Sequence, residues 1–167
     1  MIELLVIVTI SIVLSSLVLV DYGASVKLFS LERSMQDISQ GIRKVQQKAM
    51  AGIKGSGDTN GYGFYFNTAN KGSYIVYENN NTTPYYDSGD TILETIILPD
   101  DIEIESIKIN ELSQETLSIS FCPPGPITYI HDKILNQNAS ITLKITDKEI
   151  KRTIIINSSG GSEIIKD

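Results

Sequence analysis

The sequence contains a single cysteine, Cys122, and a single histidine, His131. One cysteine excludes an intramolecular disulfide and a zinc site built from cysteines, and one histidine excludes a histidine cluster. Basic residues are also few, because fourteen Lys and Arg stand against twenty Asp and Glu, for a formal net charge of −6. This balance argues against an attraction of the whole chain to nucleic-acid phosphates or to anionic lipids.

The length of 167 residues allows one domain and an appendage, since a compact domain needs about 100 to 150 residues. With 41% hydrophobic and 20% charged residues, the composition excludes a disordered polar chain and a polytopic membrane protein. Apolar residues are nevertheless concentrated in one block at the N-terminus, which sets that block apart from the rest of the chain.

Residues 4–20 contain no charged side chain, and Asp21 follows them. As a helix, this run is about 25 Å long, close to the hydrocarbon core of about 30 Å, and we expect residues 1–22 to form a membrane-spanning segment. A secretory signal peptide is not expected, because no Lys or Arg precedes the run. A plain single-pass anchor remains an alternative. The apolar positions of the segment are Leu4, Leu5, Val6, Ile7, Val8, Ile10, Ile12, Val13, Leu14, Leu17, Val18, Leu19 and Val20.

Glu3 stands at the start of this apolar block, without a basic residue on that flank to set orientation. A carboxylate beside a membrane is costly unless it is paired or reaches water, which makes Glu3 a functional candidate. The alternative is that Glu3 lies in the headgroup layer and has no special role.

Residues 23–52 predict an amphipathic helix, because apolar residues recur at alternating intervals of three and four. We expect this stripe to pack on a sheet of the same domain, with a short coiled coil as the alternative. Since no proline occurs in residues 2–50, the two segments are expected to form one helix of about 70 Å. Glycines 52, 55 and 57 then end it. The stripe consists of Leu28, Leu31, Met35, Ile38, Ile42, Val45 and Ala49.

Residues 53–167 change to short apolar runs separated by turn residues, which is typical of a β domain. In residues 102–109, the isoleucines that alternate with polar residues change from even to odd positions near Ser106, so we expect a β-bulge there. Asp147 begins an expected hairpin turn. A single helix followed by hairpin-connected strands predicts an α+β fold with an antiparallel sheet packed on the helix. The expected strands are residues 62–66, 73–78, 92–97, 102–109, 116–121, 140–146, 151–157 and 163–165.

The motif Ile2-Glu3-Leu4-Leu5 and the apolar block behind it resemble the N-terminus of type IV prepilin-like proteins. The body resembles minor pseudopilins of type II secretion and minor pilins of type IV pili, of the GspH/FimT-like type. The segments that carry this second resemblance are Gly63-Phe64-Tyr65-Phe66, Ile97-Leu98-Pro99 before Ile102-Glu103-Ile104, Ile119-Ser120-Phe121 before Pro124-Gly125, and residues 153–156 before Gly160-Gly161.

The resemblance implies a pilin-like fold and a structural or assembly-priming minor subunit of a pseudopilus or pilus. It implies that the apolar helix first lies in the bacterial cytoplasmic membrane, with the β domain on the periplasmic side. Its implied partners are other pilin or pseudopilin subunits and the inner-membrane assembly platform. Where a short basic leader ending in glycine precedes the sequence, prepilin peptidase would cleave it and methylate the new N-terminus. Glu3 would then pair with the N-terminal amine of a neighbouring subunit.

No enzymatic site is expected, and neither is a cofactor. Asp87 and Asp90 offer two carboxylates to a cation, but regularly spaced oxygen ligands are lacking, so a polar loop is the preferred interpretation. His131 is expected to be a surface-loop residue, and Cys122 a small buried or loop thiol.

Two alternative functions remain open. The first is a DNA-binding minor pilin, for which the late basic group of Lys144, Lys148, Lys151 and Arg152 is the candidate, although Asp147 and Glu149 lie among these cations. Nucleic acid is therefore not an expected partner. The second is a single-pass membrane-anchored β domain that does not polymerise, in which Glu3 would have no role in assembly.

Overall fold

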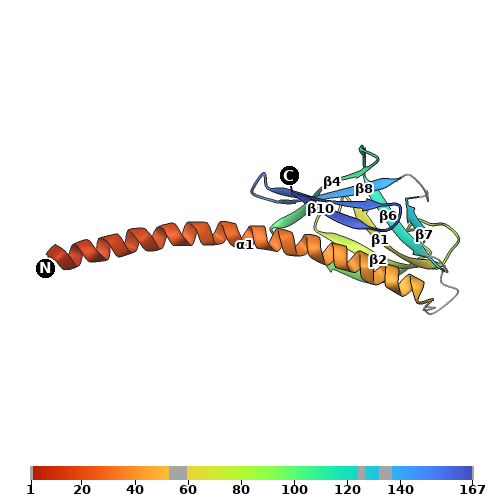
Figure 1. Cartoon of the computed structure of the whole chain (residues 1–167), viewed down its shortest axis with the longest axis horizontal. Helices are drawn as coiled ribbons and strands as arrows, with labels where there is room; N and C mark the ends of the chain where they lie inside the picture. Colours follow the sequence, from red (N-terminus) through yellow and green to blue (C-terminus); the bar gives the residue numbers. More distant parts are fainter. Residues whose placement is uncertain (1, 53–59, 124–126, 132–136, 167) are drawn as a thin grey trace.

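A computed structural model of the chain describes residues 2–52, 60–123, 127–131 and 137–166. Within the helix, the side chains of residues 17–22 and 24 lie outside this description. The α+β prediction is confirmed: one N-terminal helix packs against two antiparallel β-sheets (Figure 1).

Helix α1 spans Ile2–Met50, 49 residues without interruption, as the absence of proline in this segment predicts. Its first half projects away from the body, and its second half lies against the sheets (Figure 1). At the C-terminal end, the Ala51 amide donates to the Gln47 carbonyl at 2.9 Å, and Gly52 takes the left-handed conformation at φ 59°. Gly52 therefore stops the helix, as expected, while glycines 55 and 57 lie outside the described residues.

The strands form two five-stranded sheets with the orders β3-β2-β1-β6-β7 (the first sheet) and β10-β9-β8-β4-β5 (the second sheet). Every pair of neighbouring strands is antiparallel. The bounds are β1 Gly61–Asn67, β2 Ser73–Asn79, β3 Thr91–Ile97, β4 Ile102–Ile109, β5 Leu112–Gln114, β6 Thr116–Cys122, β7 Ile127–Ile130, β8 Asn138–Ile145, β9 Lys151–Asn157 and β10 Ser162–Lys166.

Strand β4 shows the expected bulge. Its pairing with β8 shifts register between Ile104 and Ser106, so that Ile104 and Ile107 both point into the core although they are an odd number of residues apart. The predicted hairpin between β8 and β9 is also present, closed by hydrogen bonds from the Ile145 amide to the Ile150 carbonyl and from the Lys148 amide to the Ile145 carbonyl.

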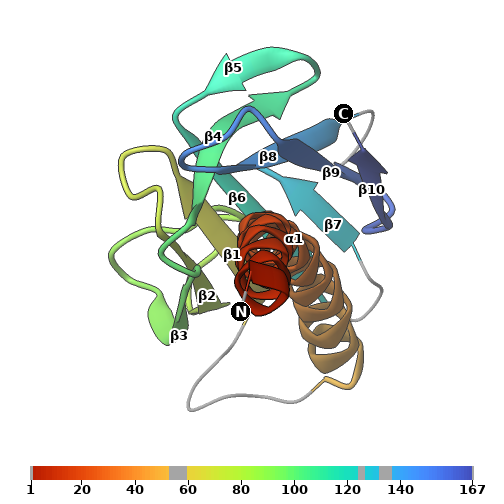
Figure 2. The ribbon, with the colours of Figure 1, turned by 90° about the vertical axis from the view of Figure 1, so that its left-hand side faces the viewer.

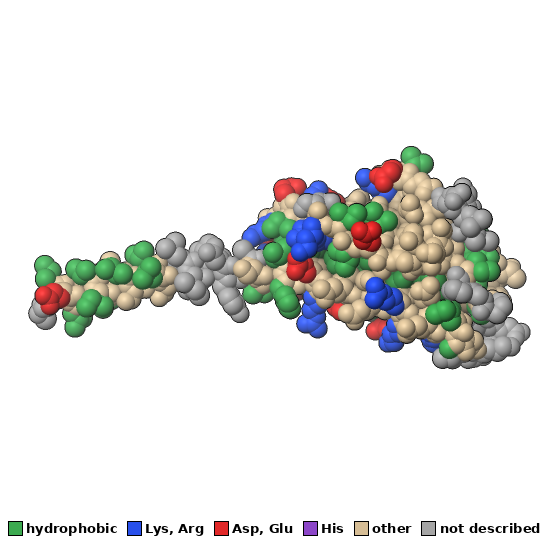
Figure 3. Space-filling view, viewed as in Figure 1, with side chains coloured by type: hydrophobic (Ala, Val, Ile, Leu, Met, Phe, Trp, Pro, Cys, Tyr) green, Lys and Arg blue, Asp and Glu red, His purple; other side chains and the backbone are tan. Residues whose placement is uncertain are grey.

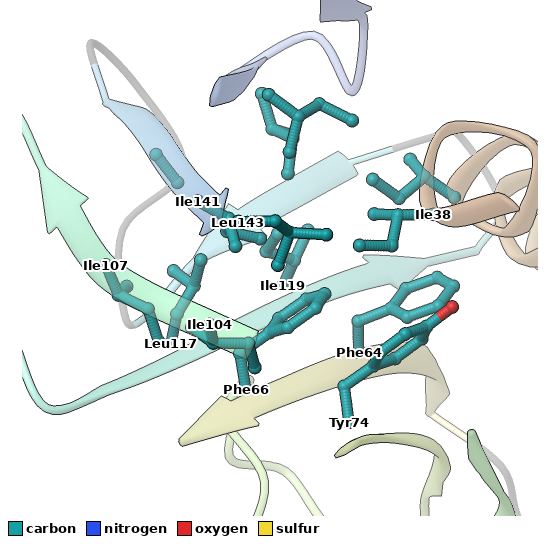
Figure 4. Close-up of a cluster of buried hydrophobic side chains, with 14 of the residues drawn as sticks. Ile38, Phe64, Phe66, Tyr74, Ile104, Ile107, Leu117, Ile119, Ile141 and Leu143 are labelled. Atoms are coloured by element: carbon teal, nitrogen blue, oxygen red, sulfur yellow. The ribbon is translucent and has the colours of Figure 1, made fainter. Parts of the chain in front are cut away.

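The core lies between the inner faces of the two sheets and the buried side of α1, which contacts strands of both sheets (Figure 2). Phe64 of β1 and Tyr74 of β2 point toward Ile38 of the helix (Figure 4). Phe66 stacks on Tyr74 with ring centroids 5.0 Å apart. One continuous core therefore joins helix and sheets, and each fully buried aliphatic side chain contributes about 1.5 to 3 kcal/mol to its stability.

Strands β5 and β7 and the division into two sheets were not predicted from the sequence. Strand β5 has three residues and follows a tight turn in which Asn110 and Glu111 have positive φ. Strand β7 has four residues, and three prolines lie within the five residues before it. Such short runs beside turn residues carry little alternation to detect.

The outer face of the first sheet is covered by the loop of residues 80–90. The Tyr86 amide donates to the Ser118 hydroxyl at 3.0 Å, and the Ser120 hydroxyl donates to the Pro84 carbonyl. The Tyr86 ring lies 5.1 Å from the ring of Tyr77, which is fully buried over Gly63. Gly63 therefore leaves the space that the Tyr77 ring occupies.

We predict that Gly63→Ala lowers the free energy of unfolding by about 2 to 3 kcal/mol. A Cβ atom at this position would lie 2.6 Å from both the Ile119 carbonyl oxygen and Tyr77 Cζ, so a strand or the ring must shift. Gly72→Ala is the matched control, because a Cβ atom there meets nothing within 4 Å. Denaturant unfolding of both variants measures the effect, and equal midpoints would contradict the packing described for Gly63.

Candidate functional site

The projecting half of α1, defined as residues 2–16, exposes its apolar side chains on every side. On the face that Figure 3 shows, hydrophobic side chains lie along this part of the molecule, whereas charged side chains lie mainly on the body. Thr9, Ser15 and Ser16 donate their hydroxyl protons to helix carbonyls three or four residues earlier, each at 2.8 Å. These three hydroxyl groups are thus satisfied within the helix. The exposed large side chains are Ile2, Leu4, Leu5, Val6, Ile7, Val8, Ile10, Ile12, Val13 and Leu14.

Leu17, Val18, Leu19 and Val20, which complete the predicted membrane segment, have side chains outside the described residues. Among the residues that the structure describes, no helix is both long and apolar enough to cross a membrane.

Glu3 lies in the first turn of α1 and is exposed. A carboxylate there interacts favourably with the positive end of the helix dipole. In residues 2–20 it is the only ionisable side chain, so the tip of the projecting half carries one negative charge next to an apolar surface.

The structure places the predicted stripe on the buried side of the second half of α1. Leu28 is half-buried where the helix meets the body. The remaining stripe residues are buried in the core, and they are Leu31, Met35, Ile38, Ile42, Val45 and Ala49.

Two polar contacts hold α1 at the point where it leaves the body. Lys27 Nζ lies 2.9 Å from Asp147 Oδ2 in the hairpin between β8 and β9. The Ser30 hydroxyl donates to Asp101 Oδ1 at 3.5 Å in the turn before β4. The hydrogen bond and the charge of Asp147 raise the pKa of Lys27, and those of Lys27 lower the pKa of Asp147. The two contacts tie α1 to the β8–β9 hairpin and to the turn before β4.

Asp87 and Asp90 organise the 80–90 loop. Asp87 accepts hydrogen bonds from the Gly89 amide at 2.7 Å and from Asn81 Nδ2 at 2.8 Å, and the Gly89 amide does most to lower its pKa. Asp90 accepts from the backbone amides of Asn80 and Asp87, while burial raises its pKa. Loop donors thus occupy the carboxylate oxygens that a cation would need. Among the described residues, no group of three His, Cys, Asp or Glu side chains is placed to hold a metal ion.

His131 and Cys122 lie apart from any cluster of reactive groups in the described chain. His131 is exposed after β7, with its ring 6.3 Å from that of Tyr85, and its neighbour Asp132 lies outside the described residues. Cys122 is half-buried at the end of β6, where burial raises the pKa of its thiol. Neither arrangement supports nucleophilic or general-base chemistry.

The late basic group is largely neutralised. Lys144 lies 3.1 Å from Glu103, Lys151 lies 2.5 Å from Glu105, and Arg152 lies 3.7 Å from Glu32 of the helix. The first two pairs join β4, β8 and β9 into a mixed-charge outer face of the second sheet, whereas Arg152 pairs with α1 on the side of the sheet that faces the helix. Such a face attracts phosphate groups weakly.

One surface was not predicted from the sequence: a furrow between α1 and β3. It consists of two grooves, of about 340 and 220 Å³, and Ile96 lines both. Strand β3 is an edge strand, so nothing in the described first sheet pairs with its outer side. We call this surface the α1–β3 furrow, lined by Val26, Phe29, Ser30, Arg33, Ser34, Asp37, Gly41, Lys44, Val45 and Lys48 of α1 and by Tyr62, Phe64, Tyr74, Val76, Leu93, Glu94, Ile96, Ile97, Leu98 and Pro99.

Two features of the sequence point to the furrow. Val26 and Phe29 are apolar but lie off the buried stripe, and both are exposed. Leu93 lines the furrow and is exposed beside the equally exposed Ile92, which departs from the alternation of a strand with one buried face, and the pairing of β3 with β2 shifts register at this point. Apolar residues outside the expected periodicity mark surface that the fold itself leaves uncovered.

Comparison of the chain with protein-family models, with curated proteins and with solved structures finds no match.

We predict that Asp147→Asn lowers stability in a pH-dependent way. The pKa of Asp147 in the folded chain lies below its ordinary value of 3.8, so its ion pair stabilises the fold above that pH. This stabilisation is lost as the pH falls through the lower, folded-state pKa. The difference in denaturation midpoint between the wild-type chain and Asp147→Asn should therefore be present near neutral pH and vanish in strong acid.

Asp100→Asn is the control, since Asp100 is an exposed aspartate in the neighbouring turn. Denaturant unfolding of the three proteins across the acidic range tests the ion pair. A difference for Asp147→Asn that persists unchanged into strong acid would show that lost packing, rather than lost charge, causes it.

Proposed function

We propose that the protein is a structural or assembly-priming minor subunit of a type II secretion pseudopilus or a type IV pilus. Before incorporation it lies in the bacterial cytoplasmic membrane through α1, with the β domain on the periplasmic side. One observation carries the proposal. A single uninterrupted helix is buried in its own domain along one half and exposes apolar side chains all round along the other.

An apolar surface of this kind needs a partner other than water. Five consecutive residues, Leu4 to Val8, are all apolar and exposed, so this stretch of the projecting half has no polar face. A helix that is apolar on every side belongs in lipid or among other helices. A bilayer and the packed interior of a helical filament both require that the backbone hydrogen bonds be made within the segment. The projecting half therefore suits a bilayer first and the interior of a filament later.

The attachment of α1 to the body supports a role in assembly. The buried stripe, the Lys27–Asp147 ion pair and the Ser30–Asp101 hydrogen bond make helix and body one unit. A subunit drawn out of a membrane by its body must transmit force to its helix. The resemblance of Ile2-Glu3-Leu4-Leu5 to prepilin-like proteins favours the same function, with other pilin-type subunits, the assembly platform and, where a leader precedes the chain, prepilin peptidase as partners.

A membrane-anchored β domain that does not polymerise is the second candidate. It accounts equally for the apolar helix, but it gives Glu3 no role. Glu3 therefore separates the two functions, because a carboxylate among packed helices must be paired, whereas one at a membrane surface reaches water.

We predict that Glu3→Gln leaves the amount of protein in the membrane fraction unchanged but lowers its incorporation into filaments about tenfold or more. Removing one partner of a buried ion pair costs several kcal/mol. Glu163→Gln, the same chemical change on exposed β10, is the control. Quantitative immunoblotting of membrane and sheared-filament fractions measures both effects, and normal incorporation of Glu3→Gln would favour the non-polymerising anchor.

DNA binding is less favoured, since Lys144, Lys151 and Arg152 each lie beside a glutamate. We predict that the detergent-solubilised full chain does not retard duplex DNA in a low-salt gel shift at about 10 µM, where even non-specific binders form complexes. A salt-sensitive shift that is lost on replacing Lys144 and Lys151 with Gln would instead assign DNA binding to the second sheet.

A further inference from the structure

The end of the body from which the projecting half leaves is apolar on one side of α1 and charged on the other. We propose that the apolar side, which we call the basal patch and which consists of Val26, Phe29, Ile97 and Pro99, rests on the headgroup layer of a lipid bilayer, so that α1 leans toward β3. The proposal rests on the membrane location in the proposed function. It adds a second membrane contact, made by the body itself.

The basal patch joins two elements that are far apart in the sequence. Val26 and Phe29 belong to α1, while Ile97 ends β3 and Pro99 follows it. All four line the groove of about 340 Å³ in the α1–β3 furrow. Phe29 is 68% exposed and Ile97 is 77% exposed. Large apolar side chains that gather on the surface from two elements mark a contact with something other than water.

Both elements of the basal patch lie where α1 leaves the body. The Ser30 hydroxyl, next to Phe29 in the chain, donates to Asp101 in the turn that follows Pro99. This end of the body faces the projecting half (Figure 1). In the proposed function it therefore faces the membrane surface, where lipids can reach the patch.

The distance along α1 brings the patch close to the headgroup layer. Val26 and Phe29 come four and seven residues after residue 22, where the expected membrane segment ends, so they lie about 6 and 10 Å beyond it. The headgroup layer on each side of the hydrocarbon core is about 5 to 8 Å thick. Val26 therefore reaches this layer with α1 upright, whereas Phe29 reaches it when the helix leans toward β3.

The other side of α1 gives the direction of the lean. Lys27 follows Val26 and so points about 100° away from it around the helix. There it contacts Asp147 in the β8–β9 hairpin, whose exposed Glu149 side chain lies in water. Apolar side chains gain by entering the interface, and carboxylates lose. Membrane helices lean by about 20° on average, and side chains at the interface set the direction.

The contact is apolar rather than electrostatic. The charged residues that line this groove are Arg33 and Asp37, and the Arg33 Nε lies 3.8 Å from the Asp37 carboxylate. Asp100, which follows Pro99, is exposed and adds a negative charge beside the patch. The patch therefore has no excess of cations for anionic lipids, and a neutral phosphatidylcholine bilayer should suffice.

Fluorescence quenching in phosphatidylcholine vesicles tests the proposal on the full-length chain with Cys122→Ser. Single cysteines carry an environment-sensitive fluorophore, and some vesicles contain lipids with a nitroxide quencher near the headgroup. Labels at Phe29→Cys and Ile97→Cys should be quenched at least about threefold more than a label at Leu112→Cys. Leu112 is the matched control, because it is 68% exposed like Phe29 but pairs with Ile109 at the far end of β4.

A label at Glu149→Cys tests the lean. Glu149 lies at the same end of the body as the patch but on the charged side, so its label should be quenched no more than the label at Leu112→Cys. Quenching at Glu149 as strong as at Ile97 overturns the proposal. Labels at Phe29 and Ile97 that report a dry environment but resist the nitroxide lipids also overturn it, because a second copy then covers the patch.

A charge placed in the patch tests the cause of the contact. Phe29→Asp should lower the quenching of the label at Ile97→Cys about threefold, since a carboxylate in the interface is costly. Leu112→Asp should leave that quenching unchanged. Because Phe29 and Leu112 are both exposed, neither change should alter the unfolding midpoint. Quenching at Ile97 that is unaffected by Phe29→Asp, or that requires anionic phosphatidylglycerol, overturns the apolar contact.

A label at Ile12→Cys separates this inference from the proposed function. If nitroxides deep in the acyl chains quench it while Phe29 and Ile97 are quenched no more than Leu112, the basal patch is wrong and the membrane location stands. If the label at Ile12 is not quenched, the helix does not enter the bilayer, and both are wrong.

Discussion

The packing of one helical stripe against two sheets is the constraint on which the rest of the structure depends. Leu31, Met35, Ile38 and Ile42 lie fully buried in the same core as the inner faces of both sheets. Each contributes about 1.5 to 3 kcal/mol, whereas an exposed ion pair such as Lys27–Asp147 is screened by solvent and contributes far less. Because this packing fixes the second half of α1 to the body, the continuous first half must project from it.

A single helix therefore joins two environments. From residue 28 onward, an apolar stripe and a charged outer face suit a helix that lies on a sheet with one side in water. In the projecting half, apolar side chains on all sides suit lipid or neighbouring helices. No proline separates the two halves, so movement of the body and movement of the apolar rod are coupled. This coupling is the mechanical property that a filament subunit drawn from a membrane requires.

Local pattern was sufficient to predict much of the fold. The period of the stripe indicated which side of α1 packs, and the parity switch near Ser106 indicated the bulge in β4. Contacts between distant residues could not be predicted in this way. Lys27 and Asp147 are 120 residues apart, and only the finished topology brings them together. The α1–β3 furrow likewise depends on β3 being an edge strand, which the sequence of that strand does not reveal.

The central claim is that the projecting half of α1 is enclosed by apolar surroundings in the cell. Thiol labelling in intact membranes tests it most directly, with single cysteines placed at Leu5, Ile12 and Met50 in a chain that carries Cys122→Ser. All three positions are exposed in the isolated chain. The account predicts that a water-soluble maleimide labels the cysteine at Met50 rapidly and those at Leu5 and Ile12 at least about tenfold more slowly, because water is excluded from an apolar environment. Equal labelling at all three positions would contradict it.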